Sequence, residues 1–165
     1  MLWVCRTGKA ALYFDFFLKN KKIYIPWNGF NYNFIECKTL VDFKPFVSKE
    51  LDTVNRTTIS NTAIQLHYFC NEMRIGDYVL IPNKNSRQFV LCKLITNYRY
   101  SKNDFLPHSR SVKIILNNIP RLIFSQSDQY TLRTFRTIFK IKQEQNVLHT
   151  INNFIKLKDG KNSNG

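Results

Sequence analysis

Aromatic rings, amides and cations are the side chains of this sequence whose types and spacing could do chemistry. Trp27 ends an apolar run just before a turn signal, and the segment Tyr98-Arg99-Tyr100 alternates aromatic and basic side chains. Asn61 and Gln65 are four residues apart, so a helix would place both amides on one face. Such a set suits a nucleic-acid base held outside its duplex. Rings would stack on the base, amides would contact its Watson–Crick edge, and cations would hold the neighbouring phosphates.

Most of these residues also have a purely structural interpretation. Trp27 could belong to the hydrophobic core. Tyr98 and Tyr100 point the same way on a strand, so one of them could serve only cross-strand packing. Asn61 and Gln65 could cap or solvate their helix. The residue types alone leave both interpretations open.

The charge of the chain points to a polyanionic partner. The 165 residues include 25 Lys and Arg against 11 Asp and Glu, a formal net charge of +14. Residues 84–142 hold twelve basic and two acidic side chains, whereas residues 1–83 carry a net charge of +3 and residues 143–165 of +1. This excess of positive charge favours nucleic acid as the binding partner, and an anionic membrane surface as the second choice. A basic surface that only keeps the protein soluble is the alternative, although solubility needs less charge.

The motifs of several enzyme classes are absent from the sequence. A P-loop ends in Gly-Lys-Ser/Thr, but neither Gly8-Lys9 nor Gly160-Lys161 continues in this way. A zinc deaminase requires His-x-Glu and Cys-x-x-Cys, which do not occur. The three histidines belong to no nucleophile motif. We therefore expect a binding module without catalytic residues, metal or other cofactor.

One enzymatic alternative rests on Glu36-Cys37-Lys38, which has the Glu-x-Lys spelling found in metal-dependent nucleases. The pattern is short, and no convincing Val- and Ile-rich strand precedes it. Mg²⁺-dependent cleavage of DNA by Glu36 and Lys38 is therefore kept only as an alternative.

The sequence predicts a single cytoplasmic domain that does not enter a membrane. No apolar run reaches the roughly 18–20 residues of a spanning helix, and the start of the chain has no basic leader of the signal-peptide kind. The four cysteines form no Cys-x-x-Cys pair, so we expect buried, reduced thiols. At 44% hydrophobic residues, the chain can bury a core of its own.

Apolar periodicity predicts an α+β order of elements. Strands are expected at 2–5, 22–27, 78–82, 89–100, 112–116 and 138–142, and helices at 9–18, 40–51, 59–74, 127–137 and 143–157. Pro45 should lie in the first turn of its helix or break it. Helix 59–74 should begin at Ser or Thr and end before Gly76, and residues 158–165 form a polar tail that should fray. Hairpin-linked strands after a long helix suggest a small mixed or mostly antiparallel barrel, partly closed by helices.

A series of short motifs resembles a known family. The motifs are Ser60 to Phe69, Met73 to Pro82, Asn97 to Tyr100, His108 to Lys113, Ile119-Pro120-Arg121 with Phe124-Ser125-Gln126, and Phe135 to Ile141. Together with the opening Trp3 to Gly8 and Ile25-Pro26-Trp27, this ordered series is similar to the N-terminal domain of Mrr-type and some McrB-like restriction proteins. The resemblance covers roughly residues 1–142. The family usually has Gly before the Trp, where this chain has Pro26.

The resemblance implies a fold and a function. The fold would be PUA-like, of the EVE and YTH kind, a small mixed β-barrel flanked by helices over residues 1–142. The function would be that of a DNA-sensing module, which flips a base, often a methylated one, from double-stranded DNA into an aromatic pocket. Residues 143–165 would be a C-terminal helix or linker with a polar tail. They would lead toward a nuclease or AAA+ motor, in another domain or subunit of a restriction complex.

The residues and the resemblance together assign roles. Trp27 with Tyr98 or Tyr100 would stack on the base, and Asn61, with Gln65 beside it, would contact its edge. The segment His108 to Ser111 supplies hydroxyl and guanidinium donors suited to phosphate, although Arg110 could instead be solvated or ion-paired. The residues expected to contact the DNA backbone are Arg6, Arg99, Ser109, Arg110, Lys113 and Arg121.

Two binding alternatives stay open. The first is a YTH- or PUA-like reader of single-stranded, modified RNA that uses the same pocket. The second is a basic scaffold that contacts another subunit of a restriction complex and binds no free nucleic acid.

Overall fold

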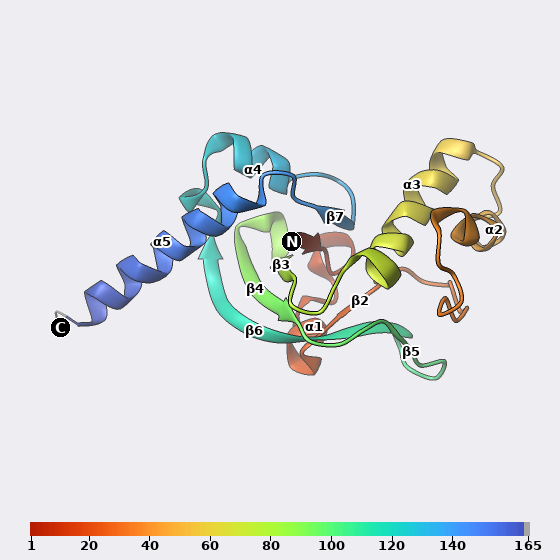
Figure 1. Cartoon of the computed structure of the whole chain (residues 1–165), viewed down its shortest axis with the longest axis horizontal. Helices are drawn as coiled ribbons and strands as arrows, with labels where there is room; N and C mark the ends of the chain where they lie inside the picture. Colours follow the sequence, from red (N-terminus) through yellow and green to blue (C-terminus); the bar gives the residue numbers. More distant parts are fainter. Residues whose placement is uncertain (164–165) are drawn as a thin grey trace.

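The structure, a computed structural model, describes residues 1–163, which form a curled sheet with helices on both faces (Figure 1). The strands are β1 (Leu2–Cys5), β2 (Lys22–Tyr24), β3 (Tyr78–Pro82), β4 (Gln88–Leu94), β5 (Arg99–Tyr100), β6 (His108–Pro120) and β7 (Ile138–Lys140). The helices are α1 (Phe14–Asn20), α2 (Leu40–Glu50), α3 (Arg56–His67), α4 (Gln126–Leu132) and α5 (Glu144–Asn162). Short helical turns are η1 (Lys9–Ala11), η2 (Tyr68–Glu72), η3 (Lys84–Ser86) and η4 (Arg121–Ile123).

The sheet is mixed and forms a half-barrel. Its strand order is β2-β6-β4-β3-β1-β7, and β5 pairs with the start of β6 on the edge opposite β2. β1 and β3 are parallel, and the other pairs are antiparallel. This confirms the expected α+β class with a mixed sheet and flanking helices.

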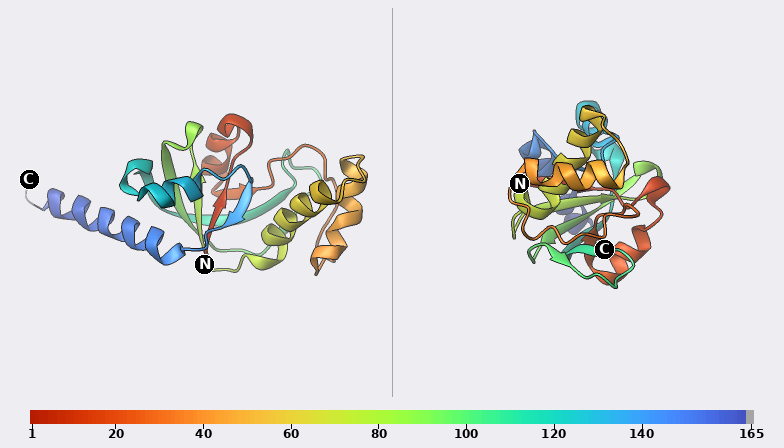
Figure 2. Two further views of the ribbon diagram at one scale, coloured as in Figure 1. Left: turned by 90° about the horizontal axis from the view of Figure 1, so that it is seen from above. Right: turned by 90° about the vertical axis from the view of Figure 1, so that its right-hand side faces the viewer.

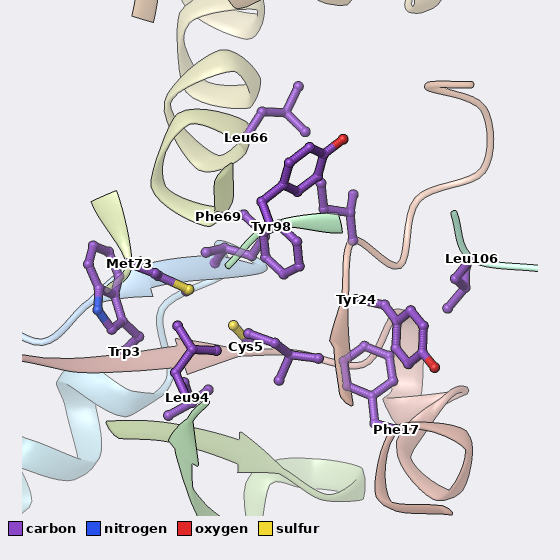
Figure 3. Close-up of a cluster of buried hydrophobic side chains, with 14 of the residues drawn as sticks. Trp3, Cys5, Phe17, Tyr24, Leu66, Phe69, Met73, Leu94, Tyr98 and Leu106 are labelled. Carbon is purple, nitrogen blue, oxygen red and sulfur yellow. The ribbon is translucent and has the colours of Figure 1, made fainter. Parts of the chain in front are cut away.

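The central strands are buried on both faces of the sheet. Successive side chains of a strand point to opposite sides, so each central strand contributes to two hydrophobic clusters. On β1, Trp3 and Cys5 enter one hydrophobic cluster, while Leu2 and Val4 enter the other. The first cluster lies under α1, α2 and α3 and is drawn in Figure 3. The second lies under α4 and the first half of α5, whose remainder projects from the body (Figure 2). A continuous apolar run such as Leu2 to Cys5 is the sequence signature of such a strand.

The long strand β6 curls the sheet. Its first residues pair with β2 and β5, and its later residues pair with β4. The register against β4 shifts on both sides of Leu91, and irregularities of this kind bend a strand and increase its twist. β6 therefore joins two parts of the sheet that would otherwise be separate.

A buried arginine on β6 holds three backbone segments in place. Arg110 is only 2% exposed. Its guanidinium donates to the carbonyl oxygens of Phe69 (3.0 Å) and Met73 (2.9 Å), at η2. It also donates to the Thr96 carbonyl at 3.1 Å and 3.0 Å. Arg110 thus caps the carbonyl end of the α3–η2 helical segment and fixes the turn after β4.

Several elements differ from the sequence prediction for identifiable reasons. The strand expected at 89–100 is interrupted at Thr96. The Thr96 carbonyl accepts from the Arg110 guanidinium (3.0 Å), and the Thr96 Oγ1 accepts from the Ser111 backbone N–H (2.7 Å). β6 is much longer than 112–116, and Pro120 is its last residue, where a missing N–H is tolerated. Helix 9–18 is divided between η1 and α1, since Ala10 and Ala11 have positive φ (54° and 56°).

The helices also begin and end at other residues than predicted. α2 continues through Pro45, and its start is stabilised by the Asp42 carboxylate, which accepts from the Thr39 N–H (2.8 Å). α3 begins three residues early because the Asn55 side chain, not Ser or Thr, accepts from Thr58 N (2.9 Å). α5 continues into the tail that was expected to fray. The last two residues of that tail lie outside the described residues.

None of the helices in residues 1–163 combines the length and apolar character needed to cross a bilayer. All four cysteines are free thiols. Cys5, Cys37 and Cys92 are buried as expected, whereas Cys70 on η2 is partly exposed.

Replacing Arg110 by Leu should lower the free energy of unfolding by more than about 3 kcal/mol, because hydrogen bonds from a charged donor contribute about 1.5–3 kcal/mol each. Urea unfolding followed by tryptophan fluorescence measures the change. Arg99→Leu is the matched control, since Arg99 is exposed and surface changes usually stay within about 0.5 kcal/mol. Equal midpoints for the two variants would show that the buried guanidinium does not support the fold.

Candidate functional site

Trp27 lies where the chain turns away from β2. Ile25 N still donates to the His108 carbonyl (3.2 Å) and so continues the pairing with β6. Gly29 (φ 83°) and Phe30 (φ 53°) then redirect the chain. The positive φ of Gly29 favours glycine, and a Cβ at this position would have to displace the Glu50 carboxylate at the end of α2. The turn leaves Trp27 partly exposed, with its ring 5.8 Å from that of Phe30.

Trp27 forms one wall of a cavity of about 650 Å³, which we call the Trp27 cavity. Four separate segments contribute its lining: Gly8-Lys9, Pro26 to Phe30, Leu51 to Gln65, and Phe135 to Thr137. The Trp27 Nε1 donates to Thr137 Oγ1 (3.3 Å) and so joins the segment after β2 to the start of β7. The volume lies within the roughly 300–1,000 Å³ range of ligand sites.

Gln65 supports the cavity from within α3. Its Oε1 accepts from the backbone N–H groups of Thr137 (2.9 Å) and Ile138 (3.0 Å), and its Nε2 donates to the Asn61 carbonyl (3.0 Å). Gln65 is buried. Its amide is therefore already used to hold α3 against β7, and its role is to position the cavity wall.

Polar, basic and aromatic side chains form the rim of the Trp27 cavity. Asn61 is exposed on α3, and its Oδ1 accepts from Arg136 Nη2 (3.4 Å). Phe135 is completely exposed, so its ring is free to stack on a planar ligand. Lys9 also lines the cavity and is exposed. The cavity thus combines two aromatic rings, an accessible amide and two cations.

A second hollow adjoins the Trp27 cavity. It has a volume of about 800 Å³ and shares Gly8, Lys9, Phe135 and Thr137 with the cavity. We call it the basic hollow, since its lining includes Arg6, Lys9, Arg121 and Arg133. Among the residues that the structure describes, no Asp or Glu lines either space. Cations in a concave surface of low dielectric constant concentrate the field and attract anions.

The two predicted tyrosines do not reach the Trp27 cavity. Tyr98 is 8% exposed and belongs to the first hydrophobic cluster, beside Leu66 and Phe69 (Figure 3). Tyr100 is partly exposed and packs on His108, with ring centroids 5.2 Å apart. The expected sandwich of Trp27 with either tyrosine is therefore corrected. The aromatic residues that line the cavity with Trp27 are the buried Phe30 and the exposed Phe135.

Tyr98 instead supports the cavity through His108. The His108 Nε2 donates to the Phe30 carbonyl (2.6 Å), which leaves Nδ1 as the acceptor for the Tyr98 hydroxyl (2.8 Å). The Tyr98 oxygen accepts in turn from Phe34 N (3.2 Å). Burial lowers the pKa of His108, and the hydrogen bond to Phe30 only partly opposes this shift. A neutral His108 therefore holds the Phe30 backbone against which Trp27 packs.

The residues expected to contact phosphates are divided by the structure. Arg6 and Arg121 line the basic hollow. Arg99 is exposed on β5 and Lys113 on β6, and neither lines the Trp27 cavity or the basic hollow. Ser109 and Arg110 are each 2% exposed. The assignment of Arg110 to phosphate is corrected, because its guanidinium already donates to the carbonyl oxygens of Phe69, Met73 and Thr96. Ser109 is paired with both β2 and β5 and lines neither the Trp27 cavity nor the basic hollow.

Sequence reasoning missed Phe135, Arg136 and Arg133 as site residues. They lie between α4 and β7, in the part of the expected helix 127–137 that is not helical. A signal was present, since Arg133-Thr-Phe-Arg136 places an aromatic residue among cations just before a strand. Like Tyr98-Arg99-Tyr100, this segment combines aromatic and basic side chains.

The alternative nuclease residues lie elsewhere. Glu36-Cys37-Lys38 forms the turn before α2, and Lys38 Nζ donates to the Ile35 carbonyl (2.6 Å). In the part of the chain from residue 1 to 163, no three His, Cys, Asp or Glu side chains come together as a metal-binding group.

A family model described as "Domain of unknown function (DUF8426)" matches residues 3–142. No curated protein and no solved structure matches the chain. The matched range includes every segment that lines the Trp27 cavity and the basic hollow, and it ends just before α5.

Because the pKa of His108 is lowered on folding, the unfolded chain takes up a proton first as the pH falls. The free energy of unfolding should therefore decrease below the unfolded pKa of about 6.5, by up to about 1.4 kcal/mol per pH unit, until the folded pKa is passed. Urea unfolding between pH 7.5 and 5 measures this slope. His108→Gln should flatten it, whereas His149→Gln, at an exposed position on α5, should not. Equal slopes in all three proteins would contradict a neutral His108.

Proposed function

For this chain, which belongs to the family described as "Domain of unknown function (DUF8426)", we propose that the Trp27 cavity binds a base extruded from double-stranded DNA. The protein then acts as a recognition module and not as an enzyme. The observation that carries the proposal is the lining of the cavity, where Trp27 and Phe135 offer ring faces beside the exposed amide of Asn61.

The physical chemistry of this lining suits a neutral, planar ligand. Stacking of a base on an aromatic side chain contributes about 1–3 kcal/mol. Methylated bases are neutral, so the extra methyl group adds stacking and apolar burial, not a cation–π interaction. The Asn61 side chain can donate and accept hydrogen bonds, which matches the edge of a base. We propose a methylated base, either N6-methyladenine or a C5-modified cytosine, as the ligand.

The surrounding charge supports a nucleic acid as the source of the base. Extrusion of a base from a duplex costs a few kcal/mol, and contacts to the flanking phosphates offset that cost. Lys9 and Arg136 stand at the rim of the cavity, with the basic hollow beside it. Binding that depends on such contacts falls steeply with salt.

A place in a restriction or defence system follows from the same proposal. The curled sheet with helices on both faces is the arrangement that a PUA-like, EVE-like domain would have, and a module that only recognises DNA requires a nuclease or AAA+ motor as partner. The projecting half of α5 (Figure 2) is a suitable connection to such a partner. Cytoplasmic DNA would be its target.

Fluorescence anisotropy on one duplex in four versions tests the base: unmodified, N6-methyladenine, 5-methylcytosine and 5-hydroxymethylcytosine. We expect one modified duplex to bind at least about tenfold more tightly than the unmodified one, a difference of about 1.4 kcal/mol. Trp27→Ala should remove this preference, because stacking is lost. Phe105→Ala is the matched control, since Phe105 is an aromatic residue 68% exposed outside the cavity lining.

The same titration separates the alternatives when it is repeated at two salt concentrations and with single-stranded RNA of equal length. Equal affinities for all duplexes with a strong salt dependence would contradict base recognition and leave backbone binding alone. Tighter binding of the RNA would favour a YTH-like reader. A failure to bind any nucleic acid at low salt would favour a docking module.

A further inference from the structure

The Lys and Arg side chains of the described residues have no acidic partners within ion-pair distance. Within residues 1–163, the ion pairs involve only the terminal ammonium group and His67, so no Lys or Arg side chain is paired with a carboxylate. Four of these unpaired cations, Arg6, Lys9, Arg121 and Arg133, line the basic hollow. An acid-free set of this kind leaves the positive potential of the hollow uncompensated.

Arg6 is held in the basic hollow by neutral groups alone. Its guanidinium donates to the carbonyl oxygens of Thr134 (2.9 Å) and Leu132 (3.0 Å), and to Ser86 Oγ (3.1 Å). Burial lowers the pKa of Arg6, since the charged form loses hydration. The side chain is therefore fixed in direction, while its charge still lacks a counter-ion.

Two buried polar atoms of the same hollow lack a hydrogen-bond partner. They are Thr7 Oγ1 and Arg121 Nε, and no other buried side-chain nitrogen or oxygen of the described chain is left in this state. Both residues line the basic hollow, and Thr7 is 1% exposed. Buried polar groups are rarely left unsatisfied, because the cost of their lost hydration is not recovered. A hydroxyl and a guanidinium N–H are both donors that a phosphate oxygen accepts from.

The loops that border the hollow have unusual backbone conformations. Ala10 and Ala11 on one side, and Asn85 and Ser86 on the other, all have positive φ (54°, 56°, 63° and 49°). Residues of this kind concentrate at ligand sites, where the surrounding structure holds them in place.

From these contacts we infer that the basic hollow binds a phosphate group. This inference rests on the proposed function for the source of that phosphate, which is the nucleotide whose base enters the Trp27 cavity. The two spaces share Gly8, Lys9, Phe135 and Thr137, so one nucleotide can reach both. Thr7, Arg6, Arg121 and Arg133 supply the donors, and Phe135 stands between the base and the phosphate.

Titration calorimetry of the full chain with pyrophosphate at low salt tests the hollow without any base. Saturable binding is expected, and Arg133→Gln should weaken it by about tenfold, the equivalent of losing one charge-assisted hydrogen bond. Arg99→Gln, which removes an exposed Arg outside the hollow, should leave it unchanged. Non-saturable binding, or equal weakening by both substitutions, would overturn the inference.

Thr7→Val distinguishes a role of the Thr7 hydroxyl in anion binding from a purely structural role. The substitution keeps the shape of the side chain but removes a hydroxyl that has no partner in the fold. The melting temperature without ligand should stay the same or rise, whereas pyrophosphate affinity should fall. Unchanged pyrophosphate affinity in Thr7→Val would show that the hydroxyl faces no anion.

Duplex and pyrophosphate titrations of the same variants separate this inference from the proposed function. Trp27→Ala should lose the preference for a modified duplex but keep pyrophosphate binding. If pyrophosphate binds through Arg133 and no modified duplex is preferred, the phosphate site stands and the proposed base site fails. If the affinity for the preferred duplex is unchanged by Arg133→Gln and Thr7→Val, the phosphate site fails alone. Duplexes with and without a 5′-phosphate distinguish the two phosphate sources, because an internal phosphate predicts equal binding and a terminal one predicts a gain.

Discussion

Two polar side chains near the start of β6, His108 and Arg110, are buried among apolar groups and must find hydrogen-bond partners there. The partners come from segments far away in the sequence: Phe30 and Tyr98 for His108, and Phe69, Met73 and Thr96 for Arg110. Each contact fixes the backbone of the segment that supplies it. The turn after β2, the end of the α3–η2 helical segment and the turn after β4 are therefore positioned around one strand.

The Trp27 cavity depends on this arrangement. His108 holds the Phe30 carbonyl, Phe30 packs against Trp27, and Trp27 reaches across to Thr137. Gln65 supports the same start of β7 from α3. Trp27 and the Asn61 amide on α3 are thus positioned by hydrogen bonds to the start of β7, and such support is what recognition of a planar base requires. The cations around it stay unpaired, a cost to the fold that an anionic partner would offset.

The sequence predicted the kinds of elements better than the roles of single residues. Strand β1, strand β3, α2 and the long helix α3 follow from apolar spacing, because periodicity reports which side of an element is buried. Trp27 and Asn61 were also predicted, and both line the cavity. Tyr98, Arg110 and Gln65 were assigned to ligand contacts, yet all three are buried and serve the fold. The residue type of a polar or aromatic side chain is the same whether it contacts a ligand or supports the fold.

The sequence alone determined the α+β class, the excess of positive charge in residues 84–142 and the presence of rings, amides and cations that suit a nucleotide. These properties depend on residue type and local spacing. Only the tertiary structure decided that Phe135 and not Tyr98 lines the cavity with Trp27, and that Arg6, Thr7, Arg121 and Arg133 face one hollow. The physical reason is that these sets are assembled by sheet pairing and by the hydrogen bonds of buried groups. Both join residues more than a hundred positions apart.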